Sequence, residues 1–600
     1  MNKKTALHSF IKSNNTFSYS LLTLFIVSQL LVHLIWGPVD YQGSLRTHAG
    51  EAFEAYHGAL NIERFGLKWW GLQDMATSPA SEAHPYLYIH HPNFGLYFST
   101  ILGKIGLTGF SQQMALSSLW WSLGIVLFAV LMTRLSLSPV LGVASAALIG
   151  FDPQNAFFYG CNIHRAADFA SATCVVLATV ALIRSPKVWT ILFMVAALFF
   201  AVGADYIQFI YLAVMAGCMV VVMPYLDQFM KSGQKEIVSK QISFNQHILH
   251  IGKCLIIVGV GAMIVFGARQ MQVLGGAGVE IWKKDFLYQI LNRTHKEQVY
   301  EGKWQEDTSS FYMENNVLNP GFAPKNSVGE RVVAIGKVLF KNMAAFLFAR
   351  LIIDSFWEML PEVVLLLVGI FVLFGISLLW FYAKRGRCTS DCAIGFHNGT
   401  LLIAVNICIG IALFVMAFGM PTYFTQWFPA FRLPLFLSAL MGALVIGRIA
   451  TFLSRMQGIF LISLLLVFKL LSLPFVVQES QDVRLDHQRV CEKLEGKIVY
   501  TNFTSASVAT YSHSVSCVPM PASFAQLAAA GRLAKISEFR FLLEKDARIN
   551  SRYFTPDYIL LFREVSGLES KDVAALRGSP HFVERTGGHS YALFERYTNE

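Results

Sequence analysis

Long apolar runs, nearly free of charged residues, recur along this chain and alternate with short polar segments. A run of about 18 or more such residues is long enough to cross the hydrocarbon core of a bilayer as a helix. The pattern therefore predicts an α-helical polytopic membrane protein with about eleven spans. The expected spans lie near residues 17–36, 114–133, 138–157, 166–183, 188–203, 205–224, 251–269, 361–383, 399–418, 430–447 and 457–475.

Basic residues fall on one side of this predicted topology. Short cytoplasmic loops are enriched in Lys and Arg. The N-terminus is therefore predicted to be cytoplasmic, and an odd number of spans places the C-terminal residues on the outer side. The basic residues on the predicted inner side are Lys3, Lys4, Lys12, Arg134, Arg184, Lys187, Lys231, Lys235, Lys240, Lys384, Arg385, Arg387, Arg448 and Arg455.

Two long segments, 38–112 and 270–360, are predicted on the outer side. Each contains a stretch with helical period, Glu51–Phe65 and Val332–Leu351. Amphipathic helices of this kind can lie in the membrane interface, where an enzyme would meet a lipid headgroup. They would suit helices packed on the top of a transporter equally well. In the second stretch, the residues expected on one face are Val333, Ile335, Val338, Leu339 and Phe346.

Residues 476–600 differ in character from the transmembrane part, 1–475. Residues 497–503 and 558–562 are typical of short buried strands, and 582–597 predicts a hairpin that turns at Gly587-Gly588. Ser523–Leu543 predicts a helix. The alternation of strands and helices indicates a small extracytoplasmic α/β domain.

Composition agrees with lipid as the solvent. Of 600 residues, 54% are hydrophobic and only 14% are charged, whereas ordinary globular proteins carry about 25% charged residues. The net charge of +10 arises in short loops, which argues against nucleic acid as a partner. The nine cysteines have no metal-site spacing, and whether Cys491 and Cys517 pair is left open. No phosphate-binding glycine loop or hydrolase motif is found.

The first outer segment holds the most suggestive charged groups. Asp40, Glu51 and Glu54 lie just beyond the first span. Each could be a general base or could orient an acceptor, although an acidic residue in a wet loop is more often only solvated. His90 and His91 follow in the same segment, and no third ligand is spaced to make them a zinc site.

Polar residues also gather at the outer ends of the predicted spans. His164, Arg165 and Asp168 begin one span, Asp205 separates two others, and Arg432 begins a later one. Asp152 lies at the outer end of another span. Ionisable groups in a membrane are costly and are usually functional or paired. Local pairing of Arg165 with Asp168 is the structural alternative. Together the cationic residues could form the wall of a cavity that holds a phosphate.

Four segments, taken in order, resemble the GT-C superfamily of membrane glycosyltransferases, especially the protein O-mannosyltransferase and lipid A aminoarabinose transferase branch. Residues 50–66 (GEAFEAYHGALNIERFG) are similar to the acidic motif of its first outer loop and the helix that follows. Residues 91–97 (HPNFGLY) resemble its His/Lys-Pro-Pro-Leu-Tyr motif. Residues 152–168 resemble the stretch that leads to an Arg-x-x-Asp span opening, and 431–434 (FRLP) resemble its late Arg-Tyr-Leu-Leu-Pro segment.

The resemblance implies an inverting glycosyltransferase that moves a sugar from a polyprenyl-phosphate carrier to a lipid, glycan or protein acceptor on the outer face. It implies Glu51 as the catalytic acid, with Asp40 and Glu54 as rivals. The donor phosphate would meet His91, Arg165 and Arg432, with His90, His164, Asp168 and Asp205 in support. No cofactor or metal is required, and a divalent metal is not excluded.

Two departures from the family pattern leave alternatives open. Glu51 stands where the family usually has Asp, and Asn93 and Phe94 replace the second Pro and the nearby Leu. A transporter or flippase of lipid-linked sugars, or an inactive scaffold, are therefore the competing hypotheses. The short loops favour a bacterial inner membrane. The sugar, the acceptor and the oligomeric state are not determined by the sequence.

Overall fold

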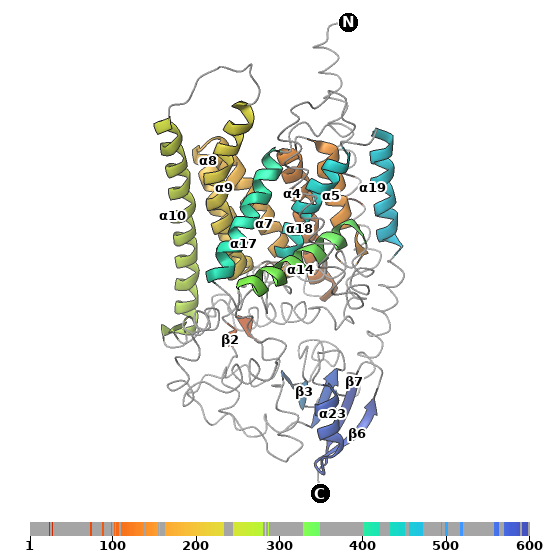
Figure 1. Cartoon of the computed structure of the whole chain (residues 1–600). Helices are drawn as coiled ribbons and strands as arrows, with labels where there is room; N and C mark the ends of the chain where they lie inside the picture. Colours follow the sequence, from red (N-terminus) through yellow and green to blue (C-terminus); the bar gives the residue numbers. More distant parts are fainter. Residues whose placement is uncertain are drawn as a thin grey trace.

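A bundle of apolar helices and a small mixed sheet make up the part of the chain that this computed structural model describes (Figure 1). The described residues are 23, 27, 73–74, 87–88, 98, 101, 104–106, 110–136, 138–153, 155, 163–232, 244–279, 282–283, 286, 328–348, 400–419, 433–450, 455–471, 494, 498–501, 516–519, 557–562, 569–587 and 591–597.

Nine helices of the bundle coincide with predicted spans. They are α4 (Phe110–Ser136), α5 (Pro139–Gly150), α7 (Ile163–Arg184), α8 (Val188–Ala204), α9 (Tyr206–Ser232), α10 (Phe244–Ala277), α17 (Thr400–Gly419), α18 (Leu433–Ala450) and α19 (Arg455–Leu470). Among the described residues, three helices are long and apolar enough to cross a membrane: Ser118–Ser136, Ala166–Arg184 and Ile248–Gly275. The span 361–383 lies outside the described residues, as does the span 17–36 apart from residues 23 and 27, so the total of about eleven stays a prediction.

Two predicted boundaries differ from the structure for identifiable reasons. The span predicted at 138–157 ends as α5 at Gly150, because the residue before a proline is driven out of helical geometry and Pro153 follows Asp152. The span predicted at 251–269 is part of the 34-residue helix α10. At about 1.5 Å per residue this helix is longer than the hydrocarbon core of a bilayer is thick.

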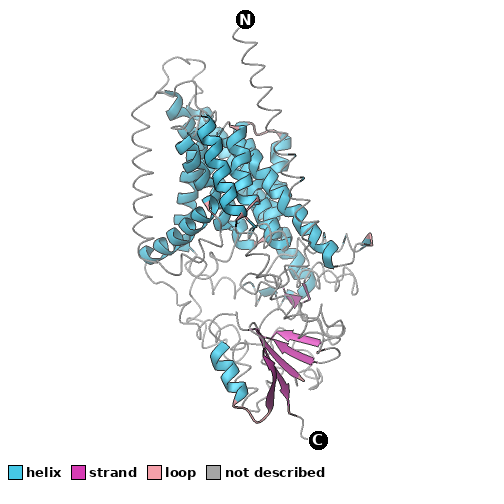
Figure 2. Cartoon of the chain, turned by 90° about the vertical axis from the view of Figure 1, so that its right-hand side faces the viewer, coloured by secondary structure: helices cyan, strands magenta, loops and turns pink. Residues whose placement is uncertain are grey.

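Described elements from all three predicted outer parts of the chain lie at one end of the bundle, which we call the outer end. Here α5, α8 and α10 finish and α7 and α9 begin. The strand β2 (Leu87–Tyr88), from the segment 38–112, lies here, paired antiparallel with β1 (Gln73–Asp74). The helix α14 (Val328–Leu347) crosses the same end, and the C-terminal sheet lies beyond it (Figures 1 and 2).

The helix predicted within 332–351 is therefore confirmed as α14, with one correction. Ile335, Leu339 and Phe346 are buried as expected, but Val333 is exposed. Val333 lies six residues before Leu339, about 240° around the helix, and so falls outside the buried stripe.

The C-terminal sheet has the strand order β4-β3-β5-β7-β6. Its strands are β3 (Ile498–Thr501), β4 (Ser516–Pro519), β5 (Tyr558–Phe562), β6 (Phe582–Gly587) and β7 (Tyr591–Arg596). The strand β3 is parallel to both neighbours, and β7 is antiparallel to β5 and β6. The strand β4 and the helix α23 (Glu569–Arg577) are additions to the elements predicted, and the helix predicted at 523–543 lies outside the described residues.

Tyr558 ties the central strand β5 to its neighbour β7. Its hydroxyl donates a hydrogen bond of 2.9 Å to Glu595 on β7. Burial raises the pKa of Tyr558, and the hydrogen bond to Glu595 raises it further. The phenol therefore stays protonated at neutral pH and keeps its role as a donor.

An aromatic cluster forms the centre of the bundle. Phe169 of α7 lies between Trp121 and Phe128 of α4 and Phe436 of α18, with ring centroids 5.2 to 5.8 Å away. Offset and edge-on contacts at such distances add about 0.5–1.5 kcal/mol each beyond burial. The cluster therefore fixes α4, α7 and α18 against one another.

Close approach of the helices depends on small residues, because lipid provides no hydrophobic force that drives helices together. A Cβ atom added at Gly142 of α5 would lie 2.6 Å from the backbone oxygen of Ala129 on α4. A Cβ at Gly442 of α18 would lie 2.3 Å from the ring of Phe346 on α14. Both crossings thus require glycine at these positions.

Gly142→Ala is expected to destabilise the bundle by about 1–3 kcal/mol, because α5 must move away from α4. Thermal unfolding in detergent measures the change. Gly410→Ala on α17, where an added Cβ meets nothing within 4 Å, is the matched control. Equal unfolding temperatures for the two variants would contradict the close packing of α4 and α5.

Candidate functional site

The predicted catalytic residues, two of the three predicted phosphate ligands and one predicted supporting residue, His90, lie outside the described residues. These are Asp40, Glu51, Glu54, His90, His91 and Arg432. His164 and Arg165 lie in the first turn of α7, where the structure describes the backbone and not their side chains. Their assignments stay predictions. Asp152, Asp168 and Asp205 are described in full.

Asp168 and Asp205 come together at the outer end through Gln208. Asp205 connects α8 to α9, and its Oδ1 accepts a hydrogen bond of 2.7 Å from the backbone N–H of Gln208. The side-chain Nε2 of Gln208 donates to the carbonyl oxygen of Asp168 at 2.5 Å and to Ser171 Oγ at 3.2 Å. All four residues are buried. Asp205 therefore acts as the N-terminal cap of α9, and Gln208 ties this helix to α7.

Asp152 forms a buried ion pair with a lysine that the sequence reasoning missed. The Nζ of Lys469, near the end of α19, lies 3.0 Å from Asp152 Oδ2, and both side chains are fully buried. The same Nζ donates to the carbonyl oxygens of Ala345, at 2.8 Å, and Phe348, at 2.7 Å. These three acceptors match the three N–H donors of an ammonium group. Lys469 therefore joins α19 both to the residues after α5 and to the C-terminal end of α14.

Each charge of the Asp152–Lys469 pair also lies at the end of a helical segment whose partial charge is opposite to its own. Asp152 Oδ1 accepts a hydrogen bond of 3.1 Å from the backbone N–H of Asn155, so the carboxylate caps the turn that begins at Pro153. The ammonium of Lys469 lies against carbonyls at the negative end of α14. Each buried charge thus has an opposite charge on one side and a favourable helix end on the other. This arrangement offsets the cost of burying both charges.

Arg269, on α10, is a second buried cation that the sequence reasoning missed. Its Nε donates to Tyr206 Oη at 2.9 Å, and its Nη1 donates to Gln272 Oε1. Its guanidinium also lies over the Tyr206 ring, 5.9 Å from the centroid. Only 6% of Arg269 is exposed, and its Nη2 has no hydrogen-bond partner among the described residues.

The side-chain amide of Asn155 is a second buried group at the outer end whose hydrogen bonds are not satisfied by the described residues. Asn155 is 1% exposed, and neither its side-chain oxygen nor its nitrogen has a partner within the described part of the chain. Buried polar atoms are nearly always paired in folded proteins. Asn155 and Arg269 therefore provide free hydrogen-bonding capacity at the outer end. In the same described residues, no group of three His, Cys, Asp or Glu side chains is placed to hold a metal ion.

A sequence signal for both missed cations exists. Lys469 is a single lysine within the apolar run 457–475, and Arg269 ends the apolar run 251–269. An ionisable residue inside a predicted span is by default a functional or paired group. Applied to every span, and not only to the acidic residues and their neighbours, this rule would have selected both.

Comparisons with known proteins identify only distant structural similarity. No protein-family model and no curated protein matches the chain. The structure is similar to the apo oligosaccharyltransferase of Archaeoglobus fulgidus, with 11% identity and a TM-score of 0.45 over 94% of this chain and 71% of that one. It is also similar to ArnT from Cupriavidus metallidurans bound to undecaprenyl phosphate, with 12% identity and a TM-score of 0.44 over 96% of this chain and 98% of that one.

The resemblance to GT-C glycosyltransferases rests on the sequence motifs, and these distant structural likenesses add no argument to it. At 11% and 12% identity and TM-scores of 0.45 and 0.44, the likeness defines neither the chemistry nor the site residues of this chain. Those depend on its own side chains.

Lys469→Met is expected to destabilise the protein by about 3–5 kcal/mol, because it leaves the carboxylate of Asp152 buried without its cation. Thermal unfolding in detergent measures the loss. The double variant Asp152→Asn/Lys469→Met removes both charges and should recover most of it. Lys253→Met, on the exposed side of α10, controls for the loss of a lysine. A single variant as stable as the double variant would contradict the account of the buried pair.

Proposed function

We propose that this chain is an inverting glycosyltransferase that moves a sugar from a polyprenyl-phosphate carrier to an acceptor at the outer face of a membrane. The observation that carries the proposal is Arg269, a buried and permanently charged guanidinium at the outer end of an apolar bundle. Within the described residues it makes no ion pair, and its Nη2 is free of hydrogen bonds. A phosphate group would provide both the negative charge and the hydrogen-bond acceptors that this guanidinium lacks.

Fixed neighbours prepare Arg269 for an anion. Tyr206 and Gln272 hold two of its five N–H donors. Because the guanidinium is planar, the directions of the remaining donors are set before a ligand arrives. Pre-set donors stabilise a developing charge well because they need no reorganisation during the reaction. A leaving lipid phosphate gains negative charge as the bond to the sugar breaks, and Arg269 would stabilise that charge.

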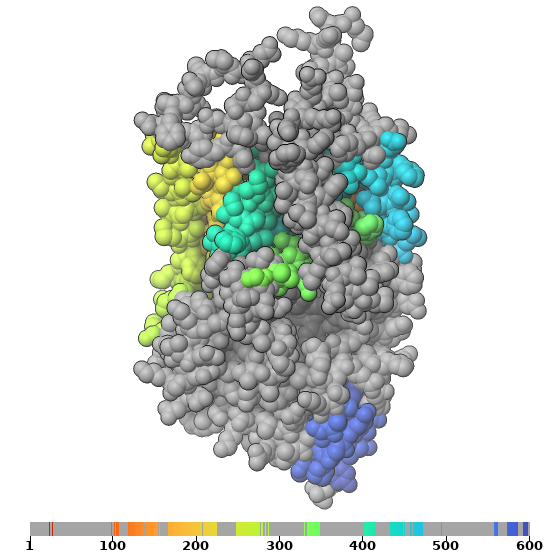
Figure 3. Space-filling model, in the orientation of Figure 1, coloured from red at the N-terminus to blue at the C-terminus, as the bar shows by residue number. Residues whose placement is uncertain are grey.

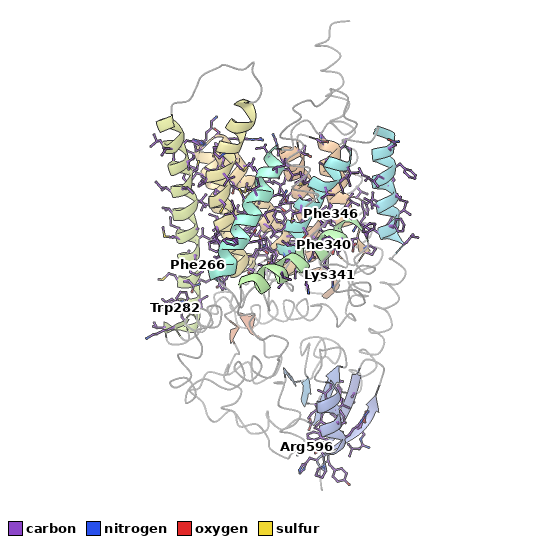
Figure 4. All side chains as sticks on the ribbon, in the orientation of Figure 1. Phe266, Trp282, Phe340, Lys341, Phe346 and Arg596 are labelled. Carbon is purple, nitrogen blue, oxygen red and sulfur yellow. The ribbon has the colours of Figure 1, made fainter. Side chains whose placement is uncertain are left out.

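The surroundings of Arg269 suit an amphiphilic carrier. Along α10, the side chains of Ile256, Met263, Ile264 and Met271 are more than 60% exposed, and the helix forms one flank of the molecule (Figure 3). Such an apolar surface matches lipid tails. Just beyond α10, Trp282 donates a hydrogen bond of 2.8 Å to Gln270 (Figure 4). Tryptophan is enriched where a membrane meets water, which is the depth of a lipid phosphate.

The chemistry in this proposal follows the family resemblance. Glu51, or else Asp40 or Glu54, accepts the proton of the acceptor nucleophile. The nucleophile attacks the anomeric carbon from the side opposite the phosphate, and the bond from carbon to phosphate oxygen breaks. The electron pair of that bond stays on the lipid phosphate. Arg269 stabilises it, together with the predicted ligands His91, Arg165 and Arg432. His90, His164, Asp168 and Asp205 support these groups.

Purified wild type is expected to transfer sugar from at least one radiolabelled polyprenyl-phosphate sugar to acceptors in a membrane extract. Glu51→Gln should lower this rate by roughly 100-fold or more, because it removes the general base and keeps its shape. If Glu51→Gln turns over as fast as wild type, Glu51 is not the general base, and Asp40 or Glu54 becomes the candidate. If wild type consumes none of the polyprenyl-phosphate sugars offered, the proposal of a glycosyltransferase is wrong. The transporter or scaffold hypothesis then takes its place.

Arg269→Gln is expected to weaken binding of undecaprenyl phosphate by roughly 10- to 100-fold, which is the effect of losing a hydrogen bond to a charged group. Titration of the lipid into protein in detergent measures the dissociation constant. Arg184→Gln, at the opposite end of the bundle and exposed, is the matched control. Equal affinities for the two variants would remove Arg269 from the site.

A further inference from the structure

Lys469 is placed to do more than stabilise the bundle, because two of its three acceptors belong to the end of α14. The last carbonyls of a helix have no partner within the helix. Lys469 provides one for Ala345 and for Phe348, from a helix more than 100 residues away in the sequence. Its position is fixed in turn by Asp152, so that the C-terminal end of α14 is held from α5 and α19 together.

The remainder of α14 is attached to the bundle through α18. Ser438 Oγ donates a hydrogen bond of 2.8 Å to the carbonyl oxygen of Leu339. Phe346 packs on Gly442, one turn further along α18. The helix α18 therefore contacts α14 at its middle, Leu339, and near its end, Phe346, whereas Lys469 holds the end through its charge.

The opposite face of α14 carries two lysines. Lys337 and Lys341 are one turn apart and half-buried. Lys341 is two residues from Leu339, about 200° around the helix, and so lies away from the buried stripe. The helix thus places two cations across the outer end, at the level where a lipid headgroup meets water.

We propose that Lys469 is a positioning residue that anchors α14 across the outer end and so sets the affinity of this end for a lipid phosphate. The second part of this statement rests on the proposed function, and the first does not. Without the anchor, the end of α14 loses the partner of its carbonyls and separates from the bundle. Lys337 and Lys341 then no longer occupy fixed positions across the outer end.

The test uses the double variant Asp152→Asn/Lys469→Met, which removes the anchor without leaving a buried charge. Hydrogen exchange of the full-length protein in detergent is compared with that of wild type and of Lys253→Met. Faster exchange confined to the amides of 340–348 is expected. The dissociation constant for undecaprenyl phosphate should rise by roughly two- to thirtyfold, the range found when a coupling residue is changed.

Each outcome decides one part of the proposal. Unchanged exchange in 340–348 would overturn the anchor. Faster exchange with unchanged affinity would overturn the positioning role and leave Lys469 purely structural. If wild type itself does not bind undecaprenyl phosphate, the proposed function and the positioning role both fail. The exchange result still decides the anchor in that case. Exchange that rises over the whole bundle would show general unfolding and would also count against a local anchor.

Discussion

The contact between Lys469, Asp152 and the carbonyls of α14 determines how the outer end of this protein is built. It lies where three chain segments meet: the end of α19, the turn after α5 and the end of α14. The helix α14 is in turn hydrogen-bonded to α18. A charge buried in an apolar bundle is tolerated only when opposite charge and donors surround it. Because Lys469 needs all three acceptors, the positions of these segments depend on one another.

The rest of the bundle follows from lipid being the solvent. Apolar side chains gain little by moving from lipid to protein, and accordingly α10 leaves most of its apolar surface exposed. Specific packing then depends on glycine contacts, on the aromatic cluster around Phe169, and on hydrogen bonds such as that from Gln208 to α7. The buried charged side chains of the described residues lie toward the outer end, where a headgroup, and not a lipid tail, would be the neighbour.

Much of the fold could be predicted from the sequence, because hydrophobicity determines the positions of spans. Even the short run 188–203 is a helix, α8, and the outer amphipathic helix was found from its period alone. The end of α5 was missed because Asp152-Pro153 was treated as part of an apolar run. Strand β4 was missed because its four residues, SCVP, carry no alternation.

The candidate site was harder to predict. Acidic motifs guided the choice of residues, so Asp168 and Asp205 were selected, and both proved to be buried in one hydrogen-bond network. Lys469 and Arg269 were not selected, and two of their partners, Asp152 and Tyr206, lie more than 60 residues away. Only the packing of α19 on α5 and of α10 on α9 reveals what these cations contact. The central claim is that the outer end binds a lipid phosphate, and photo-crosslinking with a polyprenyl phosphate that carries a diazirine beside the phosphate tests it most directly. Labelled peptides from the outer ends of α9, α10 and α14 are predicted. Labels confined to the opposite end of the bundle, or spread evenly along its apolar flanks, would contradict the claim.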